Sequence, residues 1–157
     1  MNTLVVYATR SGNTRHVADA IAEALRPRGS VDVMAAEDAP TVLPPVDLLF
    51  VGGPTEGHRV TKPVVEFLEH LAPGSLRGVA AAAFDTRIDW PRLLSGSAAA
   101  EISKRLAAAG AAVIEPEGSF LVTKKPLLEP GEAARAAAWA ATVATVAAER
   151  MAAPANR

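Results

Sequence analysis

Short apolar runs alternate along this chain with longer segments in which hydrophobic residues recur at helical spacing. The short runs are rich in valine, leucine and alanine and are bounded by glycine, proline or polar residues, as buried strands are. The expected strands are Asn2–Thr9, Ser30–Ala36, Val46–Gly53, Arg77–Phe84 and, interrupted by the sequence EPEG, Ala111–Thr123. The unbroken apolar run 46–53 is typical of a central parallel strand, which is covered on both faces.

The segments between the runs predict helices. Val17, Ile21 and Leu25 fall on one face of a helix that begins at Asn13 and stops at the sequence RPRG. Further helices are expected over Thr61–Leu71, Ser95–Gly110 and Pro130–Arg150. Strands that alternate with helices form βαβ units around a parallel sheet. We therefore predict a doubly wound α/β fold in one domain, residues 1–150, followed by a disordered tail, residues 151–157.

Composition narrows the class of protein. The 157 residues contain no cysteine, which excludes disulfides, thiolate zinc sites and cysteine nucleophiles. No apolar stretch is long enough to span a bilayer, and the start MNTLVVYATR lacks the basic residues of a signal peptide. We expect a cytoplasmic protein without membrane insertion. The formal net charge of −1 gives no basic footprint for nucleic acid.

The sequence TRSGNT lies between the first expected strand and the first expected helix. Ligands of open α/β sheets bind outside the carboxyl ends of the strands, so this loop is a candidate site. Thr9, Ser11 and Thr14 offer hydroxyls, Asn13 offers an amide, and Gly12 allows close backbone approach. With the helix N-terminus behind them, these neutral donors suit a phosphate group. The alternative is a polar turn in which Ser11 or Asn13 only caps the helix.

Other site classes are disfavoured. The loop contains neither G-x-x-x-x-G-K-[ST] nor G-x-G-x-x-G, and the first strand lacks the acidic residues of a receiver domain. No G-x-S-x-G elbow supports a triad hydrolase. Glu56, Asp85 and Asp89 follow the spacing of no metal motif.

The sequence TRSGNT resembles the phosphate loop of the flavodoxin family, [T/S]-x-[T/S]-G-x-T, and matches it at every specified position. Val46–Arg59 resembles the third strand and first flavin loop of that family, and Val79–Trp90 resembles the fourth strand and second flavin loop. The resemblance extends over the whole chain, at the length of a short-chain flavodoxin. It implies a five-stranded parallel sheet of order 2-1-3-4-5 and non-covalently bound flavin mononucleotide (FMN).

The resemblance implies flavin contacts from three loops. The phosphate loop would use side chains of Thr9, Ser11, Asn13 and Thr14, helped by the backbone of Arg10 and Gly12. The first flavin loop would run beside the isoalloxazine ring with Pro54, Thr55, Glu56 and Gly57. Gly57 stands where a backbone carbonyl can turn toward N5 of the flavin. The second flavin loop would approach the pyrimidine edge with Asp85, Thr86 and Arg87, mostly through backbone atoms.

The chain departs from the family pattern in its aromatic residues. Flavodoxins usually hold the flavin between two aromatic rings, but Glu56 stands where the first is often a tryptophan. His58 is the only ring in that loop, and it is either a flavin contact or an exposed loop residue. In the second loop, Phe84 is expected in the core, while Trp90 either covers the flavin or lies on the surface.

Charge departs from the pattern as well. Flavodoxins that shuttle electrons are typically acidic, whereas this chain is nearly neutral and carries one arginine in each expected loop: Arg10, Arg59 and Arg87. Each is a solvated surface residue, or the three together attract an anionic substrate or partner.

The interpretation is an FMN-binding electron carrier with a redox partner protein. The alternatives are a flavin-dependent reductase or oxidase of a small stacked substrate, such as a quinone, porphyrinogen or another flavin, and a flavodoxin-fold binding module without redox turnover. A monomer or weak dimer is expected; Leu127 and Leu128 either pack under the last helix or form a contact surface. Trp139 is expected to anchor the last helix in the core.

Overall fold

The computed structural model describes residues 1–154, apart from the side chains of Arg92 and Ser95. The strands are β1 (Thr3–Tyr7), β2 (Val31–Ala35), β3 (Leu48–Glu56), β4 (Arg59–Val60), β5 (Ala80–Ile88), β6 (Ala112–Val113) and β7 (Gly118–Val122). The α-helices are α1 (Asn13–Leu25), α2 (Lys62–Glu69), α3 (Arg92–Ser95), α4 (Ala98–Ala108) and α5 (Glu132–Ala152). Short 3₁₀ turns η1 (Arg26–Arg28) and η2 (Ala36–Asp38) flank β2.

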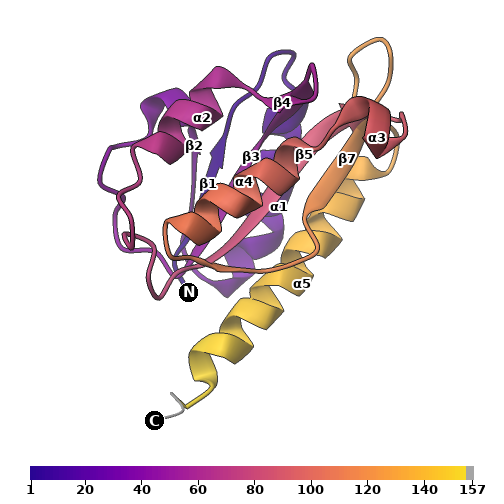
Figure 1. Ribbon diagram of the computed structural model, residues 1–157. Coiled ribbons are helices and arrows are strands. Elements are labelled where there is room, and N and C mark those ends of the chain that lie inside the picture. The colour runs from indigo at the N-terminus through magenta and orange to yellow at the C-terminus, as the bar shows by residue number, and fades with distance from the viewer. Residues whose placement is uncertain (155–157) are drawn as a thin grey trace.

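The strands form one twisted sheet of order β2-β1-β3-β5-β6 (Figure 1). β7 also pairs with β5 in parallel, beyond the end of β6, because the sequence EPEG interrupts the last strand as predicted. Counting β6 and β7 as one interrupted strand, the order is the predicted 2-1-3-4-5. β4 is an addition that the sequence did not predict, and it pairs antiparallel with the end of β3.

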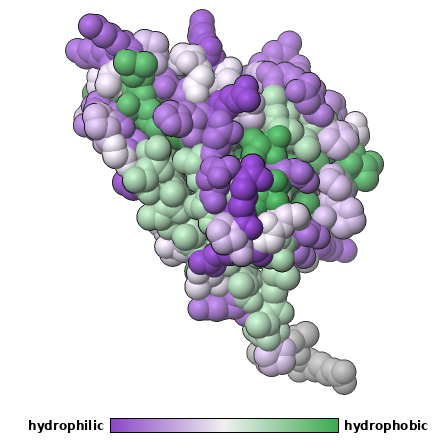
Figure 2. Space-filling view, turned by 180° about the vertical axis from the view of Figure 1, so that it is seen from behind, coloured by the Kyte–Doolittle hydropathy of each residue, from purple (hydrophilic) through white to green (hydrophobic). Residues whose placement is uncertain are grey.

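Helices cover both faces of the sheet (Figure 1). Alternate residues of β1 point to opposite faces: Val5 belongs to the core under α1 and α5, whereas Leu4 and Val6 belong to the core under α2 and α4. All five β1 residues are buried, as the continuous apolar run predicts. Figure 2 shows the side with α1 and α5, where the alanine-rich α5 forms a pale green band toward the lower end.

Trp139 of α5 anchors the first of these cores, as predicted. Its ring meets those of Phe50, Phe120 and Phe84 edge to face, with centroids 5.5, 5.8 and 6.4 Å apart. Phe84 is fully buried, also as predicted. Gly52 on the central strand makes room for it, since a Cβ there would lie 2.2 Å from the Phe84 ring.

Several element ends differ from the predicted ones. β3 and β5 continue through Glu56 and Ile88, so both strands extend into the expected flavin loops. α4 is capped by Ser97, whose Oγ accepts a hydrogen bond from the Ala100 N–H, and the separate helix α3 precedes it. α5 ends at Ala152, two residues past the expected domain boundary; residues 155–157 of the expected tail lie outside the described residues.

No helix within residues 1–154 combines the length and the apolar character needed to cross a membrane. Leu128, in the segment between β7 and α5, packs against the core under α5, while Leu127 is 64% exposed. Leu128 therefore packs under the last helix, as one alternative predicts, whereas Leu127 does not.

Candidate functional site

Three segments meet at the carboxyl edge of the sheet. Tyr7 at the end of β1 lies beside Gly52 of β3, which in turn lies beside Phe84 of β5. The residues that follow these positions thus emerge side by side. β2 lies on one side of β1 and β3 on the other, so the strand order reverses here, where α/β sheets bind their ligands.

The phosphate loop leaves the start of α1 open. Gly12 is the N-cap, with a left-handed φ of 89°, and no side chain caps the helix. The alternative in which Ser11 or Asn13 caps α1 is therefore wrong, since Asn13 is already the first helical residue. A helix N-terminus without a side-chain cap carries unpaired N–H groups and a partial positive charge, and both favour an anion.

The hydroxyls of the loop keep a proton to donate. The Thr9 hydroxyl accepts from the Gly12 N–H at 3.0 Å, and the Ser11 hydroxyl accepts from the Asn13 amide at 3.2 Å. A hydroxyl that accepts still has its own O–H. Thr14 and Thr86 are buried and share one hydrogen bond of 2.9 Å between two hydroxyls, which leaves one of their two protons free within the pair. This donor set fits a phosphate group.

The first flavin loop is a tight hairpin. Glu56 pairs with Arg59, and the turn residues Gly57 and His58 have φ of 51° and 68°. Positive φ at both central residues is the signature of a type I′ turn, which matches the twist of the flanking strands. Arg10 of the phosphate loop reaches Glu56 with a 3.3 Å ion pair, so the two loops touch on the surface.

Asp85, at the second flavin loop, is fully buried and its carboxylate points into the protein. It accepts hydrogen bonds from four donors: the Ser119 hydroxyl at 2.6 Å, the Ala99 N–H at 3.1 Å, the Thr55 hydroxyl at 3.2 Å and the Ser97 hydroxyl at 3.4 Å. A buried carboxylate needs such partners, because it has only acceptors. Asp85 thus joins β3, β7 and the start of α4 beneath the candidate site. The sequence analysis missed this role.

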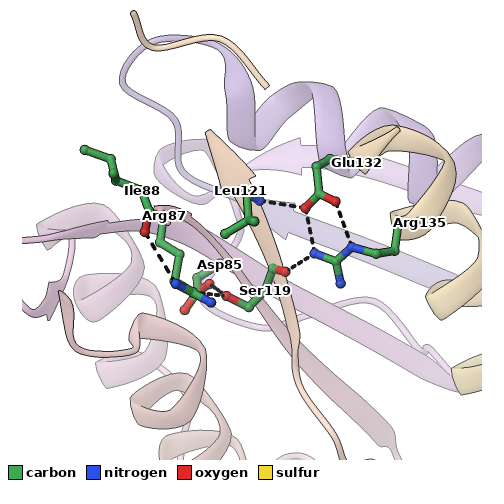
Figure 3. Close-up of polar contacts among 7 residues, drawn as sticks. All are labelled: Asp85, Arg87, Ile88, Ser119, Leu121, Glu132 and Arg135. Carbon is green, nitrogen blue, oxygen red and sulfur yellow. Dashed lines mark hydrogen bonds and ion pairs between the residues drawn. The ribbon is translucent and has the colours of Figure 1, made fainter. Parts of the chain in front are cut away.

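Ser119 links Asp85 to a second polar group (Figure 3). Its hydroxyl accepts from Arg87 Nε at 2.8 Å, and its carbonyl accepts from Arg135. Arg135 also pairs with Glu132 at 2.6 Å, and Glu132 accepts from the Leu121 N–H at 2.7 Å. The Arg135 guanidinium lowers the pKa of Glu132, and Glu132 raises the pKa of Arg135. These contacts fix β7 and α5 behind the second flavin loop.

The three loop arginines make different contacts. Arg10 is paired with Glu56, and Arg87 donates to Ser119 and to the Trp90 carbonyl. Arg59 pairs with Glu56 in the β3–β4 ladder and lines a groove between α2 and α4. The Glu56, Asp85 and Asp89 carboxylates make no metal centre, and residues 1–154 hold no group of three potential metal ligands.

Between the two flavin loops lies a cavity of about 170 Å³, lined by Thr55, Gly57, His58, Arg87, Ile88, Trp90 and Leu94. Pockets that enclose a ligand are typically about 300–1,000 Å³, so this one suits the edge of a flat ring. Trp90 beside it is 52% exposed. The sequence analysis missed its apolar neighbours Ile88, Leu93 and Leu94, which are 37%, 94% and 60% exposed. The sequence could have indicated this surface, because four large apolar residues fall within positions 88–94, from the end of β5 into α3.

Solved structures with the same fold are numerous. An archaeal flavodoxin matches over 94% of this chain and 99% of its own, with a TM-score of 0.75 and 21% identity. Oxidised flavodoxin 1 from Bacillus cereus matches over 92% and 98%, with a TM-score of 0.78 and 23% identity. Rubredoxin oxygen:oxidoreductase from Desulfovibrio gigas matches over 97% of this chain but 37% of its own, with a TM-score of 0.77 and 17% identity. At these identities the likeness establishes the fold alone.

Sequence comparison supplies the family. Among curated proteins, none matches this chain. The family profile described as a flavodoxin domain matches residues 4–83, just over half of the chain. This range contains the phosphate loop and the β3–β4 hairpin. The chain therefore belongs to the flavodoxin family.

Proposed function

We propose that this protein binds FMN non-covalently at the carboxyl edge of its sheet and transfers electrons between partner proteins. The observation that carries the proposal is the open N-terminus of α1, where Gly12 provides no side-chain cap and three hydroxyls retain protons to donate. A phosphate monoester would supply acceptors for the free N–H and O–H donors of this loop. Family membership makes a flavin the natural bearer of that phosphate.

Different residues would bind the phosphate and the ring of FMN. Thr9, Ser11 and Thr14 would donate to the phosphate, and the first-turn amides of α1 would add partial positive charge without a lysine. The cavity between the hairpin and Trp90 would receive an edge of the ring. FMN, when bound, supplies the one- and two-electron chemistry, and the protein supplies binding and orientation. Asp85 would hold the two flavin loops in register from below.

The test separates the phosphate from the ring by comparing FMN with riboflavin, which lacks the phosphate. Flavin affinity is measured from absorption and fluorescence on titration. The variant Gly12→Asp puts a negative charge beside the phosphate, and Gly12→Asn is its uncharged match, since both residues tolerate the left-handed conformation. We expect Gly12→Asp to weaken FMN binding by about 100-fold, several times more than Gly12→Asn does, because placing like charges side by side costs several kcal/mol. Riboflavin affinity should respond equally to both variants.

A second candidate is a flavin-dependent reductase of a small aromatic substrate. The exposed cluster of Ile88, Trp90, Leu93 and Leu94 favours it, because these side chains offer an apolar surface for stacking beside the flavin loops. Steady-state reduction of a soluble quinone, without any partner protein, distinguishes the two functions. An electron carrier should turn such a substrate over slowly and reduce a protein acceptor faster. A protein that binds no FMN at micromolar concentration would be a non-redox module, and both proposals would fail.

A further inference from the structure

A groove of about 720 Å³ runs between α2 and α4, on the face of the sheet opposite α1 and α5. One end of it is formed by His58 and Arg59 of the β3–β4 hairpin. His58 also lines the small cavity between the flavin loops. The hairpin turn therefore lies between the candidate ring site and the groove, so that a molecule seated in the groove abuts the flavin loops.

The groove is lined by cations from three elements. Arg59 comes from the hairpin, Lys62 from α2, and Lys104 and Arg105 from α4, against a single lining carboxylate, Glu101. Two of these cations are already paired: Lys62 with Glu66 at 3.6 Å, and Arg105 with Glu101 at 3.1 Å.

Arg59 and Lys104 are exposed, and no ion pair holds either of them within residues 1–154. Val60 and Val65 add half-buried apolar surface to the lining. Two unpaired cations over an apolar surface form a site for a ligand that carries both negative charge and aliphatic groups.

We propose that this groove is the docking site for an acidic segment of the partner protein. The lining of α4 runs from Ser97 to Arg105, roughly 12 Å at 1.5 Å per residue, which matches about four residues of an extended chain. Carboxylates spaced along such a segment can reach cations spread along two helices, whereas one compact anion would meet only a few of them. Nucleic acid fits less well, because the groove residues include no Phe, Tyr or Trp on which bases stack.

The proposal predicts how charge would guide docking on this nearly neutral chain. Docking on an acidic partner would be steered by a local positive surface rather than by the net charge of −1, so association should weaken with salt. Its consequence for electron transfer rests on the proposed function. The binding itself does not, since the groove residues make up a site separate from the phosphate loop.

The probe is a fluorescein-labelled hexaglutamate peptide, with hexaglutamine as its uncharged match, and binding is followed by fluorescence anisotropy at low salt. The variant Arg59→Glu/Lys104→Glu reverses the two unpaired cations. The control Arg26→Glu/Arg28→Glu makes the same change in formal charge at η1, which follows the far end of α1. We expect the groove variant to weaken hexaglutamate binding about tenfold and the control to change it less than twofold, because exposed charge pairs contribute little individually.

The proposal would be overturned by no binding of hexaglutamate, by equal loss in both double variants, or by equally tight binding of hexaglutamine. Equally tight binding of a six-residue oligothymidylate, lost in the same variant, would also overturn it in favour of a general polyanion site. FMN titration of the single variant Lys104→Glu, which leaves the β3–β4 hairpin unchanged, separates this proposal from the previous one, since its flavin affinity should stay at the wild-type value. Hexaglutamate binding without FMN binding would leave the groove standing and refute the flavin site.

Discussion

The two tryptophans of this protein lie in opposite kinds of surroundings. Trp139 on α5 contacts three phenylalanine rings and donates its indole N–H to the Pro116 carbonyl at 3.0 Å. Trp90, after β5, is half exposed beside a small cavity, and its exposed neighbours Leu93 and Leu94 give it no core to join. The first has its apolar rings and its polar atom satisfied by the fold. The second leaves about half of its surface exposed to solvent.

The same contrast separates two regions. On the α5 side, polar groups are paired within the protein, as Glu132 is with Arg135 and the Leu121 N–H. At the carboxyl edge, the start of α1 has no side-chain cap and hydroxyls keep free protons. Hydrogen bonds made within the protein contribute to the free energy of folding. The free donors at the carboxyl edge are available to a ligand instead.

Replacing each tryptophan by alanine measures the contrast directly. Trp139→Ala should lower the free energy of unfolding by about 3 kcal/mol, since it empties a site bordered by three rings. Trp90→Ala should change it by about 0.5 kcal/mol or less, as exposed substitutions do. Urea unfolding followed by circular dichroism gives both values without relying on tryptophan fluorescence. Similar losses in the two variants would mean that Trp90 is part of the folded core after all.

Asp85 is the exception at the carboxyl edge, because its buried carboxylate is fully partnered. Asp85→Asn replaces one carboxylate oxygen with an NH₂ group, which faces either the Ser119 hydroxyl at Oδ1 or the three donors at Oδ2. It should cost about 2–3 kcal/mol of unfolding free energy. It should also weaken FMN binding, since Thr55 and the start of α4 lose their common partner. Asp89→Asn, in the same segment but exposed, is the control and should change either quantity little. An equal response of both variants would show that the Asp85 carboxylate positions nothing.

Glu132 gives a smaller effect with a pH signature. The Arg135 guanidinium holds the pKa of Glu132 below its usual 4.5, so its stabilising contribution is fully present above that pH and fades as the pH falls through the lower folded-state value. Glu132→Gln should lower the free energy of unfolding by about 1–2 kcal/mol at neutral pH, while Gln can still accept from the Leu121 N–H. The difference from wild type should shrink in acid. A difference that is constant from neutral pH to pH 3 would contradict this account.

The sheet could be predicted because its signals are local. Apolar runs such as 46–53 must be buried on both faces, and the helices between them carry a single apolar stripe, so the α/β alternation follows from the pattern itself. The hydroxyl loop was predictable for the same reason, since all of its donors lie within Thr9–Thr14.

The polar contacts that hold the site together join distant residues and could not be predicted from local patterns. Thr14 meets Thr86 across 72 positions, and Asp85 meets Ser119 across 34. The hairpin was missed because a turn through Gly57 and His58 needs a non-glycine residue at positive φ, which β-strand pairing stabilises here. The sequence likewise did not reveal Glu56 and Ser119 as the partners of Arg10 and Arg87.

Asp85 connects the end of β3 with the start of α4 through its hydrogen bonds. Through Thr55 it touches the flavin hairpin, and through Ser97 and the Ala99 N–H it touches the first turn of α4, which lines the cationic groove. Thermodynamic linkage makes any such connection reciprocal: the factor by which flavin changes affinity in the groove equals the factor by which a groove ligand changes affinity for flavin. If both proposed ligands bind, this buried carboxylate would connect their sites, and a single coupling free energy would describe the effect of each ligand on the affinity of the other.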